Sequence, residues 1–468
     1  MSHAPAFTQG SVMRHVVVMS STASVGLMTL FVVDLVDMYF LSLLGETALA
    51  AAIGFAGSVL FFTTSINIGI AIAAGALVSR SLGAEEEERA RDYAVHTLLF
   101  GVVVSMLLSA AIWSNTETVL QWLGAKGRAL ELANNYLKIV LPSMFVLCLG
   151  MTGGAILRAA GDAKRAMYST VAGGLVNAGL DPIFIFGFNW GIEGAAWASV
   201  AARFTVMAIA LGAVHRVHRL FTRFRFITFR QTITTILGIS LPAMLTNVAT
   251  PFGNAYVMAS IADFGDSAVA GMSVIGRVIP VAFGVVFALS GAVGPIIGQN
   301  YGAQKMDRVR RAVIDGLIFG SAVVLTVCVI LFFAQSWIVT VFSATGHAAA
   351  LIAFFCTWIA ISFLFNGIQF VSNAAFNNLG VPHYSTLTNI AKATVGTVPF
   401  VFAGALIAGA EGVLAGRAIG TALVAVAALW LCLRQLTRLE SHTDIETRQK
   451  KKPFNPKNPL WPQSNTNG

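Results

Sequence analysis

Long apolar runs, separated by short polar segments, recur along almost the whole chain. A run of about twenty apolar residues is long enough to cross the hydrocarbon core of a bilayer as one helix. We expect about twelve such spans, over residues 13–43, 47–79, 93–114, 133–157, 165–188, 192–214, 232–262, 266–298, 312–342, 348–378, 384–409 and 411–434. With 56% hydrophobic and 11% charged residues, the chain is too apolar for a soluble protein of 468 residues.

Basic residues gather on alternate connections between these spans. The connection 215–231 alone holds five arginines, whereas the opposite connections offer almost only Lys126, Arg128 and Lys138. Cytoplasmic loops of membrane proteins carry the excess of Lys and Arg, so this asymmetry places both termini in the cytoplasm. It also accounts for the net charge of +9 without a nucleic-acid partner.

An internal repeat relates the two halves of the chain. The segment SLGAEEEERARDYAVHTLLFG, which starts at Ser81, aligns without gaps with NYGAQKMDRVRRAVIDGLIFG, which starts at Asn300, and Gly83 matches Gly302. Each half holds an even number of spans and therefore starts and ends on the same side. The expected fold class is an all-α membrane protein of two six-helix bundles, related by a pseudo-twofold axis along the membrane normal and arranged around a central cleft.

This repeat and the composition divide the chain into four regions. The last region is polar and contains prolines, which favours disorder. The expected regions are an N-lobe with six spans (1–214), a basic cytoplasmic linker (215–231), a C-lobe with six spans (232–438) and a disordered cytoplasmic tail (439–468).

Three acids lie inside apolar spans of the first half: Asp34 and Asp37 in the first span and Asp181 in the fifth. Burying a carboxylate in a membrane costs several kcal/mol, so such acids are candidates for a functional site. If Asp37 and Asp181 converge, they titrate as a coupled pair. The matching positions of the second half hold Asn254, Val257 and Phe400.

Polar neighbours extend this candidate site. Asn177 lies one helical turn before Asp181, so its amide faces the same side of the helix. Ser199, in the sixth span, offers a hydroxyl. Two cations of the second half, Arg277 and Lys392, are expected to be buried, with either a structural role or a contact to substrate.

Several segments together resemble the multidrug and toxic compound extrusion (MATE) family. They are VDMYFLSLLGETALAA, VSRSLGAEEEERAR, LRAAGDAKRAMYSTVAGGLVNAGLDPIFIFGFNWGIEGAAWAS and VGPIIGQNYGAQ. The motif N-x-x-x-D-P at Asn177, Asp181 and Pro182 is the most specific feature. The resemblance implies the MATE fold and, in a DinF-like branch, a coupling site at Asp37, Asn177 and Asp181. The chain departs from the family at Thr22, where a proline is usual in the first helix.

The resemblance implies a secondary active multidrug exporter that works by alternating access. We expect proton-coupled antiport of cationic or amphipathic organic compounds; sodium coupling remains the alternative, because carboxylate, amide and hydroxyl oxygens also suit a hard cation. The expected cation-coupling residues are Asp37, Asp181, Asn177, Asp34 and Ser199. The expected substrate-binding residues are Asp37, Met151, Phe62, Met258, Phe287 and Arg277.

Other functions fit the sequence less well. A lipid-linked sugar flippase of the same superfamily needs a cationic central cavity, whereas the first half holds acids. A receptor or channel does not need the internal repeat. No catalytic motif or metal-ligand spacing is present, so we expect no enzyme activity, cofactor or metal site. We expect a monomer in the lipid of the bacterial inner membrane.

Overall fold

The computed structural model of the protein describes residues 5–44 and 46–451, and the regular elements within these residues are helices. The first half contains α1 (Val12–Ser42), α2 (Thr47–Gly83), α3 (Glu87–Trp113), α4 (Thr116–Trp122), α5 (Gly127–Val140), α6 (Met144–Ala159), α7 (Ala163–Pro182) and α8 (Gly191–Arg216). The second half contains α9 (Phe226–Ala262), α10 (Asp266–Ala282), α11 (Gly284–Gly302), α12 (Met306–Val341), α13 (Gly346–Phe354), α14 (Phe363–Asn378), α15 (Pro382–Ala393) and α16 (Val398–Lys451). The predicted all-α fold class is confirmed.

Most of these helices are long and apolar enough to cross a membrane. Among the described residues there are ten such helices, or eleven if the bent pair α10 and α11 counts as one further span. One of the ten, Pro382–Ser441, is 60 residues long. A straight helix of that length would measure about 90 Å, three times the thickness of the hydrocarbon core.

The segment from α15 through α16 folds back on itself. Its backbone leaves the helical conformation at Ala408 and at Gly409, where φ is +62°, a conformation that favours glycine. On either side of this break the two arms pack closely in antiparallel order. A Cβ added to Gly412, Gly416 or Gly420 would overlap the backbone of Gly404, Phe400 or Gly396, respectively. The segment therefore crosses the membrane twice, which gives the twelve crossings that the sequence predicts.

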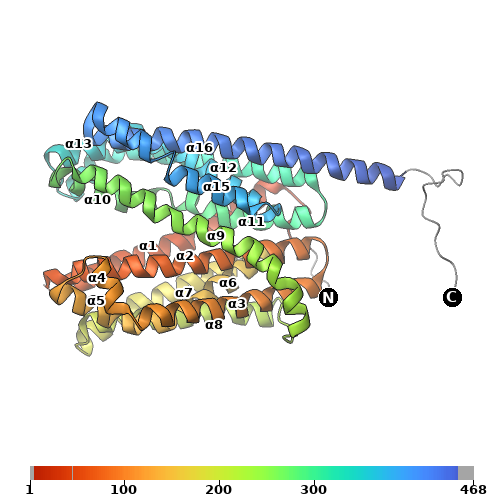
Figure 1. The fold of residues 1–468 in the computed structure, drawn as a ribbon, viewed down its shortest axis with the longest axis horizontal. Coiled ribbons are helices and arrows are strands. Elements are labelled where there is room, and N and C mark those ends of the chain that lie inside the picture. The colour runs from red at the N-terminus through yellow and green to blue at the C-terminus, as the bar shows by residue number, and fades with distance from the viewer. Residues whose placement is uncertain (1–4, 45, 452–468) are drawn as a thin grey trace, which may run out of the picture.

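The helices form two bundles that lie side by side (Figure 1). We call α1–α8 the N-lobe and α9–α16 the C-lobe, since most helix packing occurs within these groups. The repeat is visible in the elements: α6 and α14 each contain 16 residues and are related by the same offset that relates Gly83 to Gly302. A short 3-10 turn precedes each of them, Leu141–Ser143 and Ala360–Ser362.

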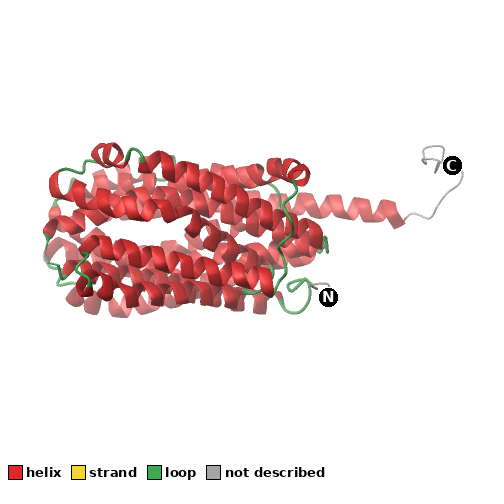
Figure 2. Ribbon diagram, turned by 90° about the horizontal axis from the view of Figure 1, so that it is seen from below, coloured by secondary structure: helices red, strands yellow, loops and turns green. Residues whose placement is uncertain are grey.

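The lobes contact each other mainly through α1 and α2 of the N-lobe and α9 and α11 of the C-lobe. We call the end with the N-terminus and the α2–α3, α6–α7 and α11–α12 connections the basic end. A Cβ on Gly83 or Gly302 there would overlap the backbone of Gln299 or Arg80 in the other lobe. Towards the other end of α2, Gly54 and Gly57 face open space. Figure 2 shows the bundle from a second side.

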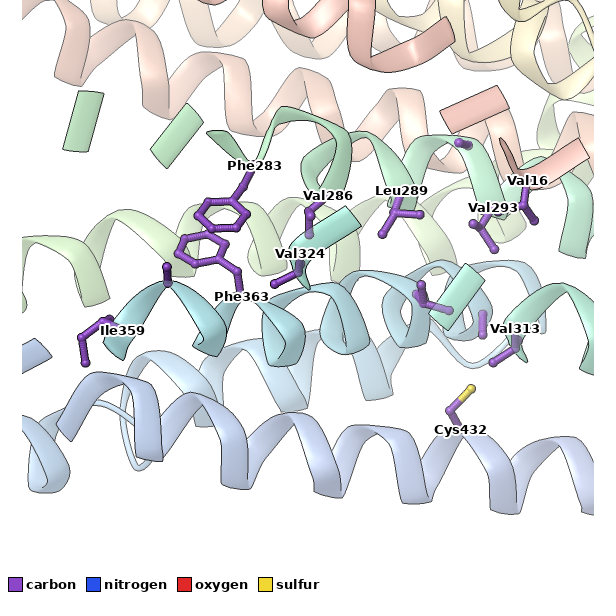
Figure 3. Packing of buried hydrophobic residues seen from close by; sticks show 14 of the residues in the cluster. Val16, Phe283, Val286, Leu289, Val293, Val313, Val324, Ile359, Phe363 and Cys432 are labelled. Atoms are coloured by element: carbon purple, nitrogen blue, oxygen red, sulfur yellow. The ribbon is translucent and has the colours of Figure 1, made fainter. Parts of the chain in front are cut away.

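The C-lobe core includes residues from the start of the chain. Phe283 and Phe363 stack face to face within this core, with ring centroids 3.9 Å apart (Figure 3). Near the basic end, Val16 of α1 packs into the same cluster beside Val293 of α11. The first residues of the chain are therefore attached to the lobe that is more distant in sequence.

The end of the chain differs in part from the sequence-based expectation. Helix α16 continues to Lys451, through the first part of the segment predicted to be disordered from residue 439. The segment before Pro453 contains no helix-breaking proline, and Glu440 forms an ion pair with Arg310 at 2.9 Å. The rest of the predicted tail, 452–468, lies outside the described residues.

Candidate functional site

The end of α7 places Asp181 at an interruption of the helix. Pro182 follows directly and has no N–H to donate to the preceding turn. The next residues, Ile183–Gly187, form a π-helical segment, a feature that often occurs at functional sites. The side chain of Asp181 is fully buried at this point.

Asp37 of α1 meets Asp181 of α7. The two carboxyl groups lie close enough to interact directly, and the amide of Asn177 lies beside Asp181. Four buried polar atoms of this site have no hydrogen-bond partner among the described residues. They are both carboxylate oxygens of Asp181, Oδ1 of Asp37 and Nδ2 of Asn177. The predicted convergence of Asp37, Asn177 and Asp181 is therefore present in the structure.

Two more polar side chains, Tyr136 and Ser199, belong to the wall of this site. Tyr136 of α5 bonds to Ser199 of α8 and lies within electrostatic reach of Asp37 and Asp181. Sequence reasoning included Ser199 but missed Tyr136. The signal available for it was the polar run Asn-Asn-Tyr within the fourth span.

Arg203 also belongs to this wall and was also missed. It lies one turn after Ser199 on α8 and near Tyr136. Its guanidinium donates to the carbonyl of Val140 at 3.0 Å and to the hydroxyl of Ser143 at 2.7 Å. These bonds hold the arginine against the α5–α6 junction.

Asp34 differs from the other two acids. It lies one turn before Asp37 on α1 and is exposed, but close enough to Asp37 for their charges to interact. Asp34 thus lies at the edge of the Asp37–Asp181 pair and not within it.

The predicted substrate-binding side chains are spread over both lobes. Phe62 and Met258 expose 44% and 37% of their surface. Met151 is half-buried, and Phe287 packs against Phe363 and Phe370 within the C-lobe. Their roles in binding remain predictions.

Arg277 does not occupy the environment that the sequence predicted. It is exposed on α10, whereas burial was expected. The apolar residues around it in sequence indicate a span, but they do not tell which face of the helix is covered. Lys392, the other predicted buried cation, is half-buried.

Within the described part of the chain, no group of three or more His, Cys, Asp or Glu side chains is arranged to hold a metal ion. The four cysteines are unpaired; Cys148, Cys356 and Cys432 are buried and Cys328 is half-buried. The polar chemistry of the site therefore rests on carboxyl, amide, hydroxyl and guanidinium groups.

Two membrane-embedded lobes related by a repeat, with unpaired acids inside one of them, define a secondary membrane transporter. The family model described as MatE matches residues 23–183 and, separately, residues 242–403. The chain therefore belongs to the MatE family, the multidrug and toxic compound extrusion transporters. The two matches fall on the two halves of the internal repeat.

Several relatives are similar over nearly their full length. A protein of Shewanella oneidensis named FAD transporter is 29% identical over 89% of this chain and 93% of its own length. The multidrug export protein MepA of Staphylococcus aureus is 24% identical over 93% of this chain and 97% of its own. Members of this family transport small molecules and are not enzymes, so the chain is a transporter.

Solved structures share the fold. The Vibrio cholerae MATE transporter VcmN has a TM-score of 0.86 and 24% identity, covering 91% of this chain and 97% of that one. An outward-facing multidrug resistance MATE transporter has a TM-score of 0.85 and 21% identity, covering 94% and 99%. At this level of identity the likeness establishes the architecture and leaves the site residues to be argued from this chain.

Proposed function

We propose that the protein exports cationic and amphipathic organic compounds in exchange for protons, with Asp37 and Asp181 as the coupling acids. The observation that carries the proposal is the contact between these two carboxyl groups in the membrane interior. Two adjacent carboxylates avoid their repulsion by sharing a proton, and an organic cation offers the same relief. Proton and substrate then compete for one site, which is the requirement for antiport.

The surrounding groups support this assignment. Asn177 and Tyr136 can each donate a hydrogen bond to a carboxylate, and Ser199 orients the tyrosine hydroxyl. Asp34, at the edge of the pair, is proposed as a relay group between the pair and the solvent. The acids in the N-lobe are the feature that resembles the DinF-like branch.

Sodium is the alternative coupling ion. Carboxylate, amide and hydroxyl oxygens suit a hard cation as well as a proton relay, and all three are present around Asp181. A lipid-linked sugar flippase is the remaining rival within the superfamily. The uncompensated acids of the N-lobe disfavour it.

We further propose that the protein acts as a monomer in the bacterial inner membrane, with both termini in the cytoplasm. The basic residues of the connection 215–231 support this orientation. In this orientation the basic end is cytoplasmic, and the contacts between the lobes close that side.

The coupling assignment can be tested by transport in proteoliposomes. Purified wild type, Asp37→Asn and Asp181→Asn would be reconstituted, and uptake of a fluorescent organic cation would be measured under separate pH and sodium gradients. We expect uptake driven by the pH gradient to fall about tenfold or more in both variants, since the charged form that binds the substrate is lost. Full activity in both variants would contradict the assignment.

Asp315→Asn is a matched control. Asp315 is also a buried acid within a span, but it forms an ion pair with Arg311 at 2.8 Å, near the basic end of α12. This variant should retain coupling even if its stability falls. Transport that follows the sodium gradient alone would replace the proton by sodium and leave the site in place.

The relative named FAD transporter makes a second substrate class worth including. FAD carries two phosphates and is therefore an anion. FAD would be added to the same uptake assay as a competitor of the fluorescent cation. Competition by FAD would extend the proposed substrates from cations to anionic amphiphiles.

A further inference from the structure

Two cations of the C-lobe lie inside membrane-spanning segments, held by amide side chains. Lys392 of α15 donates from Nζ to Oδ1 of Asn366 on α14 at 2.6 Å. Arg417 of α16 donates from Nη2 to Oδ1 of Asn254 on α9 at 2.6 Å. Four helices thus contribute one polar side chain each to a small cationic site, which we call the C-lobe cation pair.

The C-lobe cation pair has no acidic partner. Within the described residues, no carboxylate lies at ion-pair distance from Lys392 or Arg417. The acids of this lobe that do form ion pairs, Asp315, Glu411 and Glu440, have Arg311, His347 and Arg310 as their partners. Lys392 and Arg417 are also close enough for their charges to repel each other. Two uncompensated like charges in a membrane are costly, so an anion that binds between them is strongly favoured.

The helix geometry holds the two cations together. Gly396 lies in the connection between α15 and α16, and a Cβ on it would meet the backbone of Gly420 and of Lys392, so this connection approaches α16 closely beside the pair. Lys392 and Arg417 are half-buried and Asn254 is exposed, so the site remains reachable. An ammonium has three N–H donors and a guanidinium five, and the two amide oxygens use only one from each cation. The remaining donors can bind an anionic oxygen.

Arg417 of the cation pair lies in the same half of the molecule as the acid pair. Asp37 is five residues before the end of α1 at Ser42, which is the end of the molecule opposite the basic end. Arg417 is eight residues after the break at Gly409, which lies at that same end. The N-lobe therefore presents negative charge and the C-lobe, at Arg417, positive charge in this half. Lys392, ten residues after the start of α15 at Pro382, lies nearer the basic end.

We propose that Lys392 and Arg417, together with Asn366 and Asn254, bind an anionic group of the transported molecule, a carboxylate or a phosphate. The substrates then include zwitterionic amphiphiles, whose cationic part can reach the acids of the N-lobe. This inference rests on the proposed transport function, because the bound anionic group is taken to belong to the transported molecule. Its test is an equilibrium binding measurement, which does not depend on which ion drives transport.

Two fluorescent dyes that differ in one group provide the probe. Rhodamine 110 carries a free carboxylate, and rhodamine 123 is its methyl ester, a cation of nearly the same shape. Binding to protein in phosphatidylcholine nanodiscs would be measured by fluorescence anisotropy. We expect the wild type to bind rhodamine 110 more tightly, and Lys392→Gln and Arg417→Gln to weaken its binding about tenfold while changing the affinity for rhodamine 123 by about twofold or less.

Charge-conserving and charge-removing controls separate binding from structure. Lys392→Arg and Arg417→Lys should retain most of the preference for rhodamine 110. Arg434→Gln removes one positive charge from the basic end of the same helix α16 and should leave both affinities unchanged. Thermal unfolding of each variant shows whether the fold is intact.

Three results would overturn the proposal. The first is equal affinity of the wild type for the two dyes. The second is a parallel loss of both affinities in Lys392→Gln and Arg417→Gln, which would assign the pair a purely structural role. The third is displacement of rhodamine 110 by phosphatidylglycerol in the nanodisc, which would assign the anion to a lipid headgroup. If coupling through Asp37 fails in transport while the dye preference holds, only the coupling proposal falls.

Discussion

Single residues in the membrane interior of this protein carry charge in three different settings. Asp315 is neutralised by Arg311 in an ion pair. Asp37 and Asp181 face each other as like charges, and Lys392 is held by a neutral amide. The ion pair is stable without a ligand. An added proton or cation stabilises the acid pair, and an added anion stabilises the lysine. The unpaired settings are therefore the ones that we propose to respond to binding.

Asp162, outside the spans in the α6–α7 connection, gives a prediction on stability and pH. Burial raises the pKa of its carboxyl, but hydrogen bonds from His218 at 2.9 Å and from the side chain and backbone of Arg165 lower it by more, so the net pKa is well below its usual range. A lowered folded-state pKa stabilises the protein above the unfolded-state pKa of about 4, and this stabilisation is lost as the pH falls below that value.

We expect Asp162→Asn to lower the free energy of unfolding by on the order of 1 kcal/mol at pH 7, after allowance for solvent screening. The difference in melting temperature between wild type and variant, measured in detergent at several pH values, should shrink below about pH 4. A difference that stays constant down to pH 3 would contradict this role of Asp162.

At the scale of single residues, the sequence predicts a functional residue when burying its side chain in an apolar span is energetically costly. Asp37, Asn177 and Asp181 could be predicted because acids in an apolar span demand a partner, and a helical turn relates two of them. Tyr136 and Arg417 could not, because their importance comes from neighbours on other helices. The exposure of Arg277 shows the same limit, since an apolar run does not reveal which helix face is covered.

At the scale of helices, glycine sets how closely the lobes approach. Gly83 of α2 and Gly302 of α11 occupy matching positions of the repeat and lie against each other's helix at the basic end. The repeat therefore relates the contact of Gly83 to the contact of Gly302. The pseudo-twofold axis therefore passes near this contact.

Gly83→Ala should disrupt the closed basic end. The added methyl group would overlap the Gln299 backbone, and a backbone contact cannot yield as a flexible side chain can. We expect the lobes to separate at this end, detected as a longer and broader distance between spin labels on α3 and α12. Gly54→Ala, in the same helix but facing open space, is the matched control and should leave the distance unchanged. An unchanged distance in Gly83→Ala would show that the contact does not hold the lobes together.

The helices themselves were largely predictable, because apolar length decides whether a segment spans a membrane. The bounds of α1, 12–42, differ by one residue at each end from the expected 13–43. The short helix α4 was not predicted, because a seven-residue helix has too few turns to give a periodic signal. The continuation of α16 to Lys451 was missed because polar composition favours disorder but does not exclude a helix.

At the scale of the whole molecule, the start of the chain joins the two lobes. We call residues 5–10 the N-terminal strap. The carbonyl of Phe7 accepts from Arg308 at 2.8 Å and from Asn300 at 3.1 Å, and its N–H donates to Gln299 at 2.8 Å. On its other side the strap contacts Gly161 of the N-lobe and borders a cavity of about 420 Å³. Separation of the lobes at the basic end must break some of these bonds.

We expect Arg308→Ala to loosen the strap. Arg308 also donates to Gly10 at 2.9 Å, so its loss removes several charge-assisted hydrogen bonds. A cysteine placed at Thr8, which is buried, should react with a water-soluble maleimide several-fold faster in this variant. Arg310→Ala is the control, because Arg310 pairs with Glu440 and not with the strap. Equal labelling rates in the two variants would exclude Arg308 as the anchor.

In the proposed coupling through Asp37, the depth of this acid has a consequence for the electrical response of transport. The five residues between Asp37 and the end of α1 correspond to about 7 Å of helix, roughly a quarter of the hydrocarbon thickness. An ion that reaches Asp37 from that end crosses only a small part of the membrane voltage, and the rest is crossed on the way to the basic end. Binding from the near side should therefore depend weakly on voltage, and release on the far side should carry most of the voltage dependence.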